Sequence, residues 1–331
     1  MGKMHADEAD IDIALVRRLI ATQFPRWADR PIRPVASSGT DNAMFRLGDD
    51  LAVRLPRVRR ASADIATEQR WLPILAPHLP VAIPEIVEVG EPTEDLPWCW
   101  SVNRWLTGRT PQVDTLTQPE DLAIDLAEFI TALRAIDPTG APELSRGGPL
   151  ADRDEPTTAA ITASEGLVDT AALHRIWAET LAIDTPPRRV PAQSAGISVS
   201  AEGSVRLAPA PGSAHLPPPP RSARSVWAHG DLSPGNVLID QGRLRAVIDF
   251  GGFGVGDPTV DLVIAWNLLP AAARPILRAA LDVDDATWAR GRGWALSIAA
   301  IQLPYYLHTN PALAVNSRHV LDAIVADQRL G

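Results

Sequence analysis

Three polar side chains in the second half of the chain have types and spacing suited to binding a metal ion and phosphate. In the segment HGDLSPGN, Asp231 and Asn236 stand five residues apart, with Pro234-Gly235 favouring a turn between them. A further carboxylate, Asp249, ends the apolar run AVID. Carboxylate and amide oxygens suit a hard divalent cation such as Mg²⁺, which keeps its other positions for water and phosphate. Asn236 and Asp249 are therefore the expected metal ligands, and Asp231 is left to meet a substrate.

The elements around these residues would bring them together. Two short apolar strands, 237–239 and 244–248, flank a Gly-containing turn and predict a β-hairpin. Such a hairpin returns Asp249 to the loop from which the first strand left. Asp257-Pro258 then predicts an N-cap with proline at the first helical position, and the helix that follows carries Asp261.

These motifs resemble those of the aminoglycoside phosphotransferases and related small-molecule kinases, which share the protein-kinase fold. HGDLSPGN is similar to the catalytic loop H-R-D-L-x-x-x-N, with Gly230 in place of the arginine, and Asp249 opens a D-F-G element thirteen residues after Asn236. The resemblance implies that Asp231 orients the substrate hydroxyl and accepts its proton, while Asn236 and Asp249 hold Mg²⁺ on the phosphates of ATP. The residues expected to support this loop structurally are His229, Asp257 and Asp261.

The resemblance also implies a nucleotide-binding end in the first third of the chain. In that fold a cation on the third strand grips the phosphates and pairs with a glutamate on the next helix. Arg54 and Glu68 occupy these places, and Lys3 is the one lysine among 31 basic residues. Arginine stays charged and binds phosphate with a planar fork, although its geometry differs from that of lysine. The alternative is that Arg54 and Glu68 are solvated surface charges. The other expected nucleotide-binding residues lie in two places. A loop that lacks G-x-G-x-x-G contains Ser37, Ser38 and Gly39. A hinge beside adenine contains Asn103 and Trp105.

Periodicity and turn signals predict an α+β protein with a protein-kinase-like two-lobe fold. The first 105 residues predict a small antiparallel sheet with helices, and the remainder is mostly helical. The expected strands cover 32–36, 43–47, 51–55, 85–89 and 98–104, and the expected helices cover 11–23, 62–77, 119–136, 157–183, 259–269 and the tail 284–328.

The predicted domain division follows from this change in character. Residues 1–105 form the N-lobe, and residues 106–331 form the helical C-lobe with the catalytic loop. A segment at 186–225 carries nine prolines and few aromatic residues. It cannot bury enough apolar surface to offset its ordering entropy, so an irregular insertion is expected there.

Composition excludes several classes of protein. A net charge of -9 argues against a nucleic-acid partner, because such binding needs a basic face. Cys99 is the single cysteine, so neither an intrachain disulfide nor a Cys-rich zinc site can form, and a reducing cytoplasm is the expected location. No apolar run is long enough to predict a membrane span. The oligomeric state is left open.

The substrate is expected to be a small molecule. Only residues 252–256 separate the D-F-G element from the next helix cap, which leaves no room for the activation loop that serves a polypeptide substrate. The resemblance favours an aminoglycoside-type antibiotic hydroxyl and hence antibiotic resistance. Beyond residue 105 there are 25 acidic and 18 basic residues, which would suit a cationic substrate, although solvated helix faces look the same. Choline, homoserine, a sugar or a macrolide remain open. The competing hypothesis is a nucleotide-binding scaffold or pseudokinase, in which Arg54 marks lost catalysis.

Overall fold

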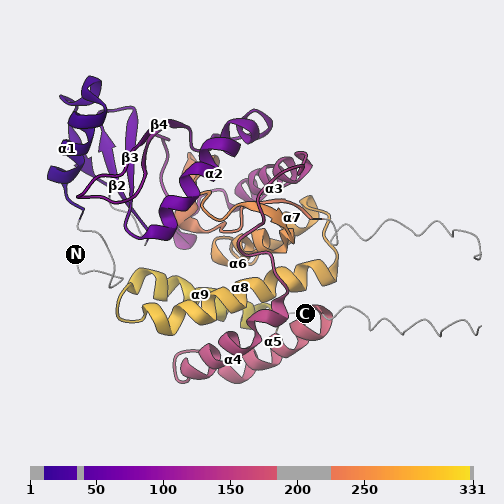
Figure 1. Ribbon diagram of the computed structural model, residues 1–331. Coiled ribbons are helices and arrows are strands. Elements are labelled where there is room, and N and C mark those ends of the chain that lie inside the picture. Colours follow the sequence, from indigo (N-terminus) through magenta and orange to yellow (C-terminus); the bar gives the residue numbers. More distant parts are fainter. Residues whose placement is uncertain (1–10, 36–40, 185–224, 329–331) are drawn as a thin grey trace, which may run out of the picture.

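The computed structural model describes residues 11–35, 41–184 and 225–328. A sheet-containing lobe lies at the upper left of Figure 1, and a larger helical lobe lies below it and to its right. The expected small antiparallel sheet and mostly helical second lobe are confirmed. The proline-rich segment expected at 186–225 lies outside the described residues, apart from Ser225.

The first lobe is built on a five-stranded antiparallel sheet with the strand order β1-β2-β3-β5-β4. β3 is central, and all six of its residues are buried, which is why it reads as a nearly continuous apolar run. The strands are β1 (Ile32–Pro34), β2 (Asn42–Leu47), β3 (Leu51–Pro56), β4 (Ile86–Gly90) and β5 (Trp100–Arg104).

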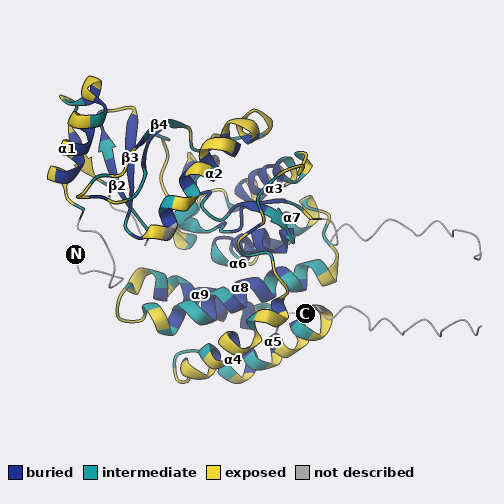
Figure 2. Ribbon diagram, viewed as in Figure 1, coloured by how far each residue is buried: buried dark blue, intermediate teal, exposed yellow. Residues whose placement is uncertain are grey.

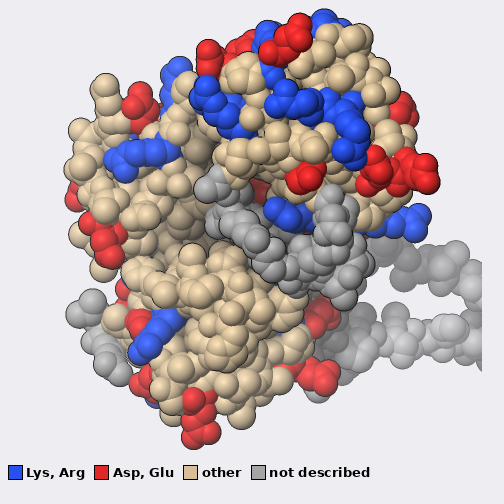
Figure 3. Space-filling view, turned by 90° about the vertical axis from the view of Figure 1, so that its left-hand side faces the viewer, with Lys and Arg blue, Asp and Glu red and all other residues tan. Residues whose placement is uncertain are grey.

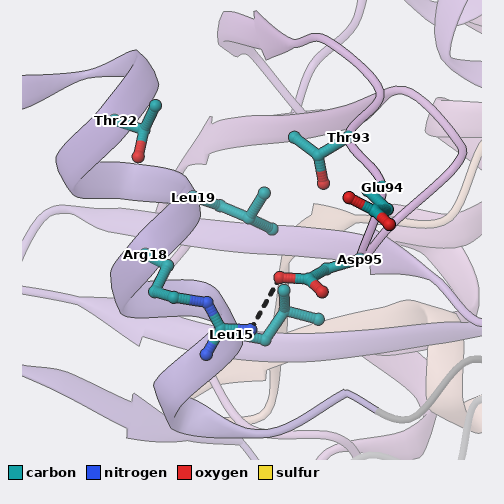
Figure 4. A pocket seen from close by; sticks show the side chains of 7 residues that line it. All are labelled: Leu15, Arg18, Leu19, Thr22, Thr93, Glu94 and Asp95. Carbon is teal, nitrogen blue, oxygen red and sulfur yellow. Dashed lines mark hydrogen bonds and ion pairs between the residues drawn. The ribbon is translucent and has the colours of Figure 1, made fainter.

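The helix α1 (Ile13–Gln23) closes the outer side of this sheet. The side chain of Asp12 caps it by accepting a hydrogen bond of 2.7 Å from the backbone N–H of Leu15. A hollow of about 260 Å³ remains between α1 and the turn at 93–95, and Figure 4 shows the ion pair of Arg18 with Asp95 (2.8 Å) at its edge.

The helix α2 (Arg59–Leu75) begins three residues before the expected start at Ser62. Ser62 does not cap the helix, because its hydroxyl donates to the backbone carbonyl of Cys99 at 3.3 Å. The last turns of α2 leave the sheet, and Trp71 and Leu72 are buried in the core of the second lobe. The two lobes are thus joined through α2 as well as through the chain after β5.

The second lobe packs its helices around α8, whose middle is buried (Figure 2). The helices are α3 (Pro119–Ala135), α4 (Asp154–Ala163), α5 (Thr170–Asp184), α6 (Ile264–Asn267), α7 (Arg274–Ala280), α8 (Asp285–Tyr306) and α9 (Pro311–Gln328). Two strand pairs lie between the lobes: β6 (Val226–Ala228) with β9 (Gly254–Gly256), and β7 (Val237–Asp240) with β8 (Arg243–Val247).

Two of the expected helices are wrong in detail. The single helix expected over 157–183 is α4 and α5, separated by a turn in which Gly166 has φ of 78°. The helix expected over 259–269 opens as a 3₁₀ helix, Pro258–Val263, before α6. No helix within residues 11–35, 41–184 and 225–328 has the length and apolarity needed to cross a membrane.

Charge is unevenly spread over the two lobes. In the view of Figure 3, basic side chains gather on the sheet-containing lobe, whereas the facing part of the helical lobe is mostly uncharged with acidic groups at its margins. The view describes this face alone, because residues 1–105 hold 13 basic and 15 acidic residues in total.

Candidate active site

The loop that carries Asp231 is held in place by one buried carboxylate, that of Asp261. Asp261, in the 3₁₀ helix before α6, accepts a hydrogen bond from the backbone N–H of His229 (3.0 Å) and another from that of Gly230 (2.8 Å). Burial raises the pKa of Asp261 above its usual range, while the two N–H donors favour the charged form. The carboxylate therefore fixes the backbone immediately before Asp231.

His229 ties this loop to the strand end that carries Asp249. Its Nδ1 accepts from the backbone N–H of Asp231 at 3.2 Å, so its Nε2 is the donor to the carbonyl of Ile248 at 3.1 Å. The ring also meets Phe250 edge to face, with centroids 4.6 Å apart. His229 is buried, and both of its ring nitrogens are used in these contacts.

The β7–β8 hairpin brings Asn236 and Asp249 together. Its strands pair from Val237 with Val247, and the backbone N–H of Ile248 donates to the carbonyl of Asn236 at 2.8 Å. Asn236 Nδ2 in turn donates to the backbone carbonyl of Asp231 at 2.9 Å and to its Oδ2 at 3.2 Å. The three residues singled out by their spacing thus lie around one site.

Asp249 adopts an uncommon backbone conformation. Its φ is 64°, in the left-handed region that few non-glycine residues occupy. The backbone turns sharply there, and the carboxylate of Asp249, 44% exposed, lies 3.5 Å from Nη2 of Arg54. Such strain at a polar residue is typical of functional sites.

Arg54 and Glu68 form a buried ion pair on the sheet side of the site. Nη1 of Arg54 donates to both carboxylate oxygens of Glu68, at 2.7 and 2.5 Å, and the two residues are 7% and 1% exposed. With its amide oxygen turned to the guanidinium, Asn42 accepts from Nη2 and Nε of Arg54 at 3.1 Å each. The alternative that Arg54 and Glu68 are solvated surface charges is therefore wrong.

The remaining residues expected to bind the nucleotide belong to the loop before β2 and to the end of β5. Ser37, Ser38 and Gly39 lie outside the described residues. Asn103 is buried on β5 across from Ala52, on the face that Arg54 shares. Trp105 donates its backbone N–H to the carbonyl of Asp50 at 2.9 Å. The β2–β3 turn therefore takes this N–H, and the contact of the hinge with adenine stays a prediction.

Asp257 stands where the sequence predicts a helix cap. Its Oδ1 accepts from the backbone N–H of Thr259 at 3.0 Å, at the start of the 3₁₀ helix that carries Asp261. Its other oxygen lies 3.7 Å from Nε of Arg290.

Two further charged residues, Asp64 and Arg146, lie at the site although they were not predicted there from the sequence. Asp64 lies one turn before Glu68 on α2, and burial together with the nearby Glu68 carboxylate raises its pKa to about 6. Its four-residue separation from Glu68, which places both on one helix face, is the signal that could have found it. Arg146 donates from Nη1 to Oδ1 of Asp231. No sequence signal points to Arg146, because it lies 85 residues away in an irregular segment.

The oxygen donors of the site fit a magnesium ion. The carboxylate of Asp249 and the side-chain amide of Asn236 come from the two adjacent ends of one hairpin. Mg²⁺ in phosphate-transferring sites binds through one or two such protein groups, with phosphate oxygens and water completing its octahedron. Asn236 and Asp249 have the chemistry for this, and no histidine or thiol competes among them.

A two-lobed fold with this catalytic loop and a buried strand–helix ion pair defines a kinase-like phosphoryl-transfer enzyme. The family model described as "Phosphotransferase enzyme family" matches residues 32–294. The chain belongs to this family, so the resemblance inferred from the sequence is confirmed.

Solved structures of similar proteins support the same fold. An aminoglycoside 2'-phosphotransferase-IIIa in complex with GDP is 19% identical, with a TM-score of 0.68 over 96% of this chain and 100% of that one. The macrolide 2'-phosphotransferase MphH from Brachybacterium faecium is 21% identical, with a TM-score of 0.57 over 94% of this chain and 98% of that one. At these identities the likeness shows the fold, and the predicted kinase-like two-lobe architecture is confirmed.

Curated relatives match over a short stretch. The aminoglycoside 3'-phosphotransferases of Escherichia coli and Salmonella typhimurium are each 46% identical over 48 residues. This stretch is 14% of the present chain and 18% of each relative.

Proposed function

We propose that this protein transfers the γ-phosphoryl group of ATP to a hydroxyl group of a small molecule. The observation that carries the proposal is the meeting of Asp231, Asn236 and Asp249 beside the buried pair of Arg54 and Glu68. A degenerate site would lose one of these groups, whereas all five are present and each of them is in contact with another of the five within 3.5 Å.

Each residue has a role in this proposal. Arg54, oriented by Glu68, binds the phosphates, and Asn236 and Asp249 hold Mg²⁺, which neutralises charge on the transferred group. Asp231 orients the acceptor hydroxyl and takes its proton. Because phosphoryl transfer depends on positioning and electrostatics more than on proton abstraction, the fixed backbone before Asp231 serves the reaction directly.

An aminoglycoside-type antibiotic is the proposed acceptor. The curated relatives are named aminoglycoside 3'-phosphotransferases, and one structure similar to this chain holds kanamycin with GDP. A macrolide is the second class to test, since macrolide 2'-phosphotransferases share the fold. The lone cysteine supports a reducing cytoplasm as the place of action.

The first test is a coupled assay of ADP release with MgATP and a panel of aminoglycosides, macrolides, choline, homoserine and simple sugars. ADP release that depends on one acceptor supports the proposal and identifies the acceptor class. Silence across the panel, together with tight MgATP binding by calorimetry, would favour a nucleotide-binding scaffold instead.

Asp231→Asn then tests the role of the carboxylate. We expect kcat to fall by about 10²- to 10⁴-fold, the usual contribution of a positioned base, while calorimetry shows unchanged MgATP affinity. Asp240→Asn, in the exposed hairpin turn nearby, is the matched control and should leave kcat unchanged. A rate within a few fold of wild type for Asp231→Asn would refute the assignment of the base.

A further inference from the structure

Arg146 reaches the carboxylate of Asp231 from outside the catalytic loop. Its Nη1 donates to Oδ1 of Asp231 and lies 3.5 Å from the backbone carbonyl of Gly230. The side chains of Arg146 and Asp231 are 38% and 41% exposed. The ion pair therefore lies at the open side of the site, where an acceptor would approach Asp231.

The backbone next to Arg146 is anchored to the loop that follows Asp249. Leu144 donates its N–H to the carbonyl of Val255 at 3.1 Å. Ser145 donates its N–H (3.2 Å) and its hydroxyl (3.0 Å) to the carbonyl of Gly252. The position of the Arg146 guanidinium is therefore set by a docked segment, unlike that of an arginine on a free surface.

The two oxygens of Asp231 have different partners. Oδ1 is held by Arg146, whereas Oδ2 accepts the longer bond of 3.2 Å from Asn236. Asn236 is also the proposed ligand of Mg²⁺, so its amide serves two groups. Arg146 is the stronger, charge-assisted anchor of the carboxylate.

We propose that Arg146 is a positioning residue for phosphoryl transfer, which fixes Asp231 through Oδ1 and leaves Oδ2 to meet the acceptor hydroxyl. This rests on the proposed function of Asp231. In the transfer, the acceptor oxygen bonds to the γ-phosphorus as the bond from that phosphorus to the bridging oxygen of ADP breaks. The hydroxyl proton passes to Oδ2 of Asp231.

A purely structural ion pair would behave differently. Half-exposed ion pairs contribute little to stability, because water screens them. If Arg146 served stability alone, its removal would change the unfolding midpoint slightly and leave kcat unchanged. A positioning role predicts instead that kcat falls while the unfolding midpoint is nearly unchanged.

The test compares Arg146→Ala and Arg146→Lys with Arg18→Ala, which breaks another exposed ion pair, that with Asp95, far from the site. For Arg146→Ala we expect kcat to fall by about 10- to 100-fold, with the KM for MgATP within about threefold of wild type and the thermal midpoint nearly unchanged. Arg146→Lys should keep more activity than Arg146→Ala, and Arg18→Ala should match wild type. If no panel acceptor reacts, the slow hydrolysis of ATP with water as acceptor provides the same comparison.

Rescue by free guanidinium ion separates a positioning role from a structural one. Millimolar guanidinium should restore part of the activity of Arg146→Ala and none to Asp231→Asn, and a crystal structure of Arg146→Ala should show the Asp231 side chain turned away. A kcat for Arg146→Ala within about threefold of wild type overturns the inference, as does an equal loss in Arg18→Ala. If Asp231→Asn is inactive and Arg146→Ala is normal, the inference alone fails. If Asp231→Asn stays active, the proposed function of Asp231 fails with it.

Discussion

At the scale of single residues, the site holds one carboxylate that was not expected from the sequence, that of Asp64. Asp64 lies beside Glu68 on α2, and a side-chain atom of Asp64 lies 3.0 Å from the place a Cβ would occupy on Gly251. Burial, followed by repulsion from Glu68, raises the pKa of Asp64 from 3.8 to about 6. Asp64 therefore opposes folding whenever it is ionised.

The sign of this effect gives a pH-dependent prediction. Because the folded protein binds the Asp64 proton more tightly than the unfolded chain, the contribution of Asp64 to stability falls as pH rises from about 4 to above 6. Asp64→Asn removes the buried charge. We expect it to increase the free energy of unfolding at pH 7.5 by about 1 kcal/mol once solvent screening is allowed for, and by less at pH 5.

Urea denaturation of the nucleotide-free protein at several pH values measures this difference. Asp49→Asn, at an exposed turn, is the control, and its stability should follow that of wild type across the pH range. Equal stabilities of Asp64→Asn and wild type at pH 7.5 would contradict the raised pKa.

At the scale of elements, the catalytic loop depends on a short helix that follows it by 31 or 32 residues. Asp261→Asn keeps the size of the side chain but replaces one carboxylate oxygen with an NH₂ group. The backbone N–H groups of His229 and Gly230 both need an acceptor, and the amide offers one oxygen. We expect the free energy of unfolding to fall by about 3 kcal/mol, since charged acceptors of buried N–H groups are expensive to lose. We also expect kcat to fall, because the backbone before Asp231 loses its anchor.

Chemical denaturation together with the ADP-release assay tests this support. Asp257→Asn is the matched control on the same 3₁₀ helix, because asparagine caps a helix about as well as aspartate does. A similar loss of stability in both variants would show that the loss does not come from the contact of Asp261 with the catalytic loop.

The elements also show how far the sequence predicts the structure. The hairpin, the helix cap and the spacing from Asp231 to Asn236 were predicted because they follow from turn residues and strand patterns within about 30 residues. The Arg146 contact joins residues 85 positions apart, which approach only after folding. The break between α4 and α5 was missed although two residues there are typical of turns and caps: Gly166, with its positive φ, and Asp169, whose carboxylate accepts from the backbone N–H of Ala172.

The fold and the family follow from the sequence, but the functional roles of the site residues remain predictions. The resemblance to the kinase fold implies a pair between Arg54 on the third strand and Glu68 on the next helix, and the structure brings the two into contact. The place of Trp105 in a hinge beside adenine is implied by the resemblance, and the hydrogen bond of its N–H to the turn from β2 to β3 is a contact that the sequence does not predict. Local patterns place residues on elements, and competition for hydrogen bonds between elements decides which groups stay free.

At the scale of the whole molecule, Arg54 connects the two lobes. It pairs with Glu68 on α2 and lies 3.5 Å from Asp249, which belongs to the second lobe. Glu68→Gln would leave the Arg54 guanidinium buried without the carboxylate of Glu68. Among the contacts described above, Asp249 would then be the remaining carboxylate within its reach. We expect the free energy of unfolding to fall by about 3–5 kcal/mol, the usual result of removing one partner from a buried pair.

The same change should weaken metal binding. A guanidinium drawn toward Asp249 competes with Mg²⁺ for that carboxylate, so we expect the Mg²⁺ concentration for half-maximal activity to rise several fold. Titration of Mg²⁺ at fixed ATP measures this, and Glu85→Gln, which alters an exposed pair with Arg104, serves as the control. An unchanged Mg²⁺ requirement would argue against Asp249 as a ligand.

Gly230 has a consequence for how the enzyme can be controlled. Its φ is 82°, and a Cβ there would lie 2.9 Å from Leu144 and 3.0 Å from the carbonyl of Gly252. The arginine that many protein kinases carry at this place, which lets a phosphorylated activation loop order itself, therefore has no room. Evolution could not add that switch by one substitution without also moving the 143–147 segment. The chain therefore has no room for that form of control at Gly230, in keeping with the short stretch from residue 252 to residue 256 that leaves no place for an activation loop.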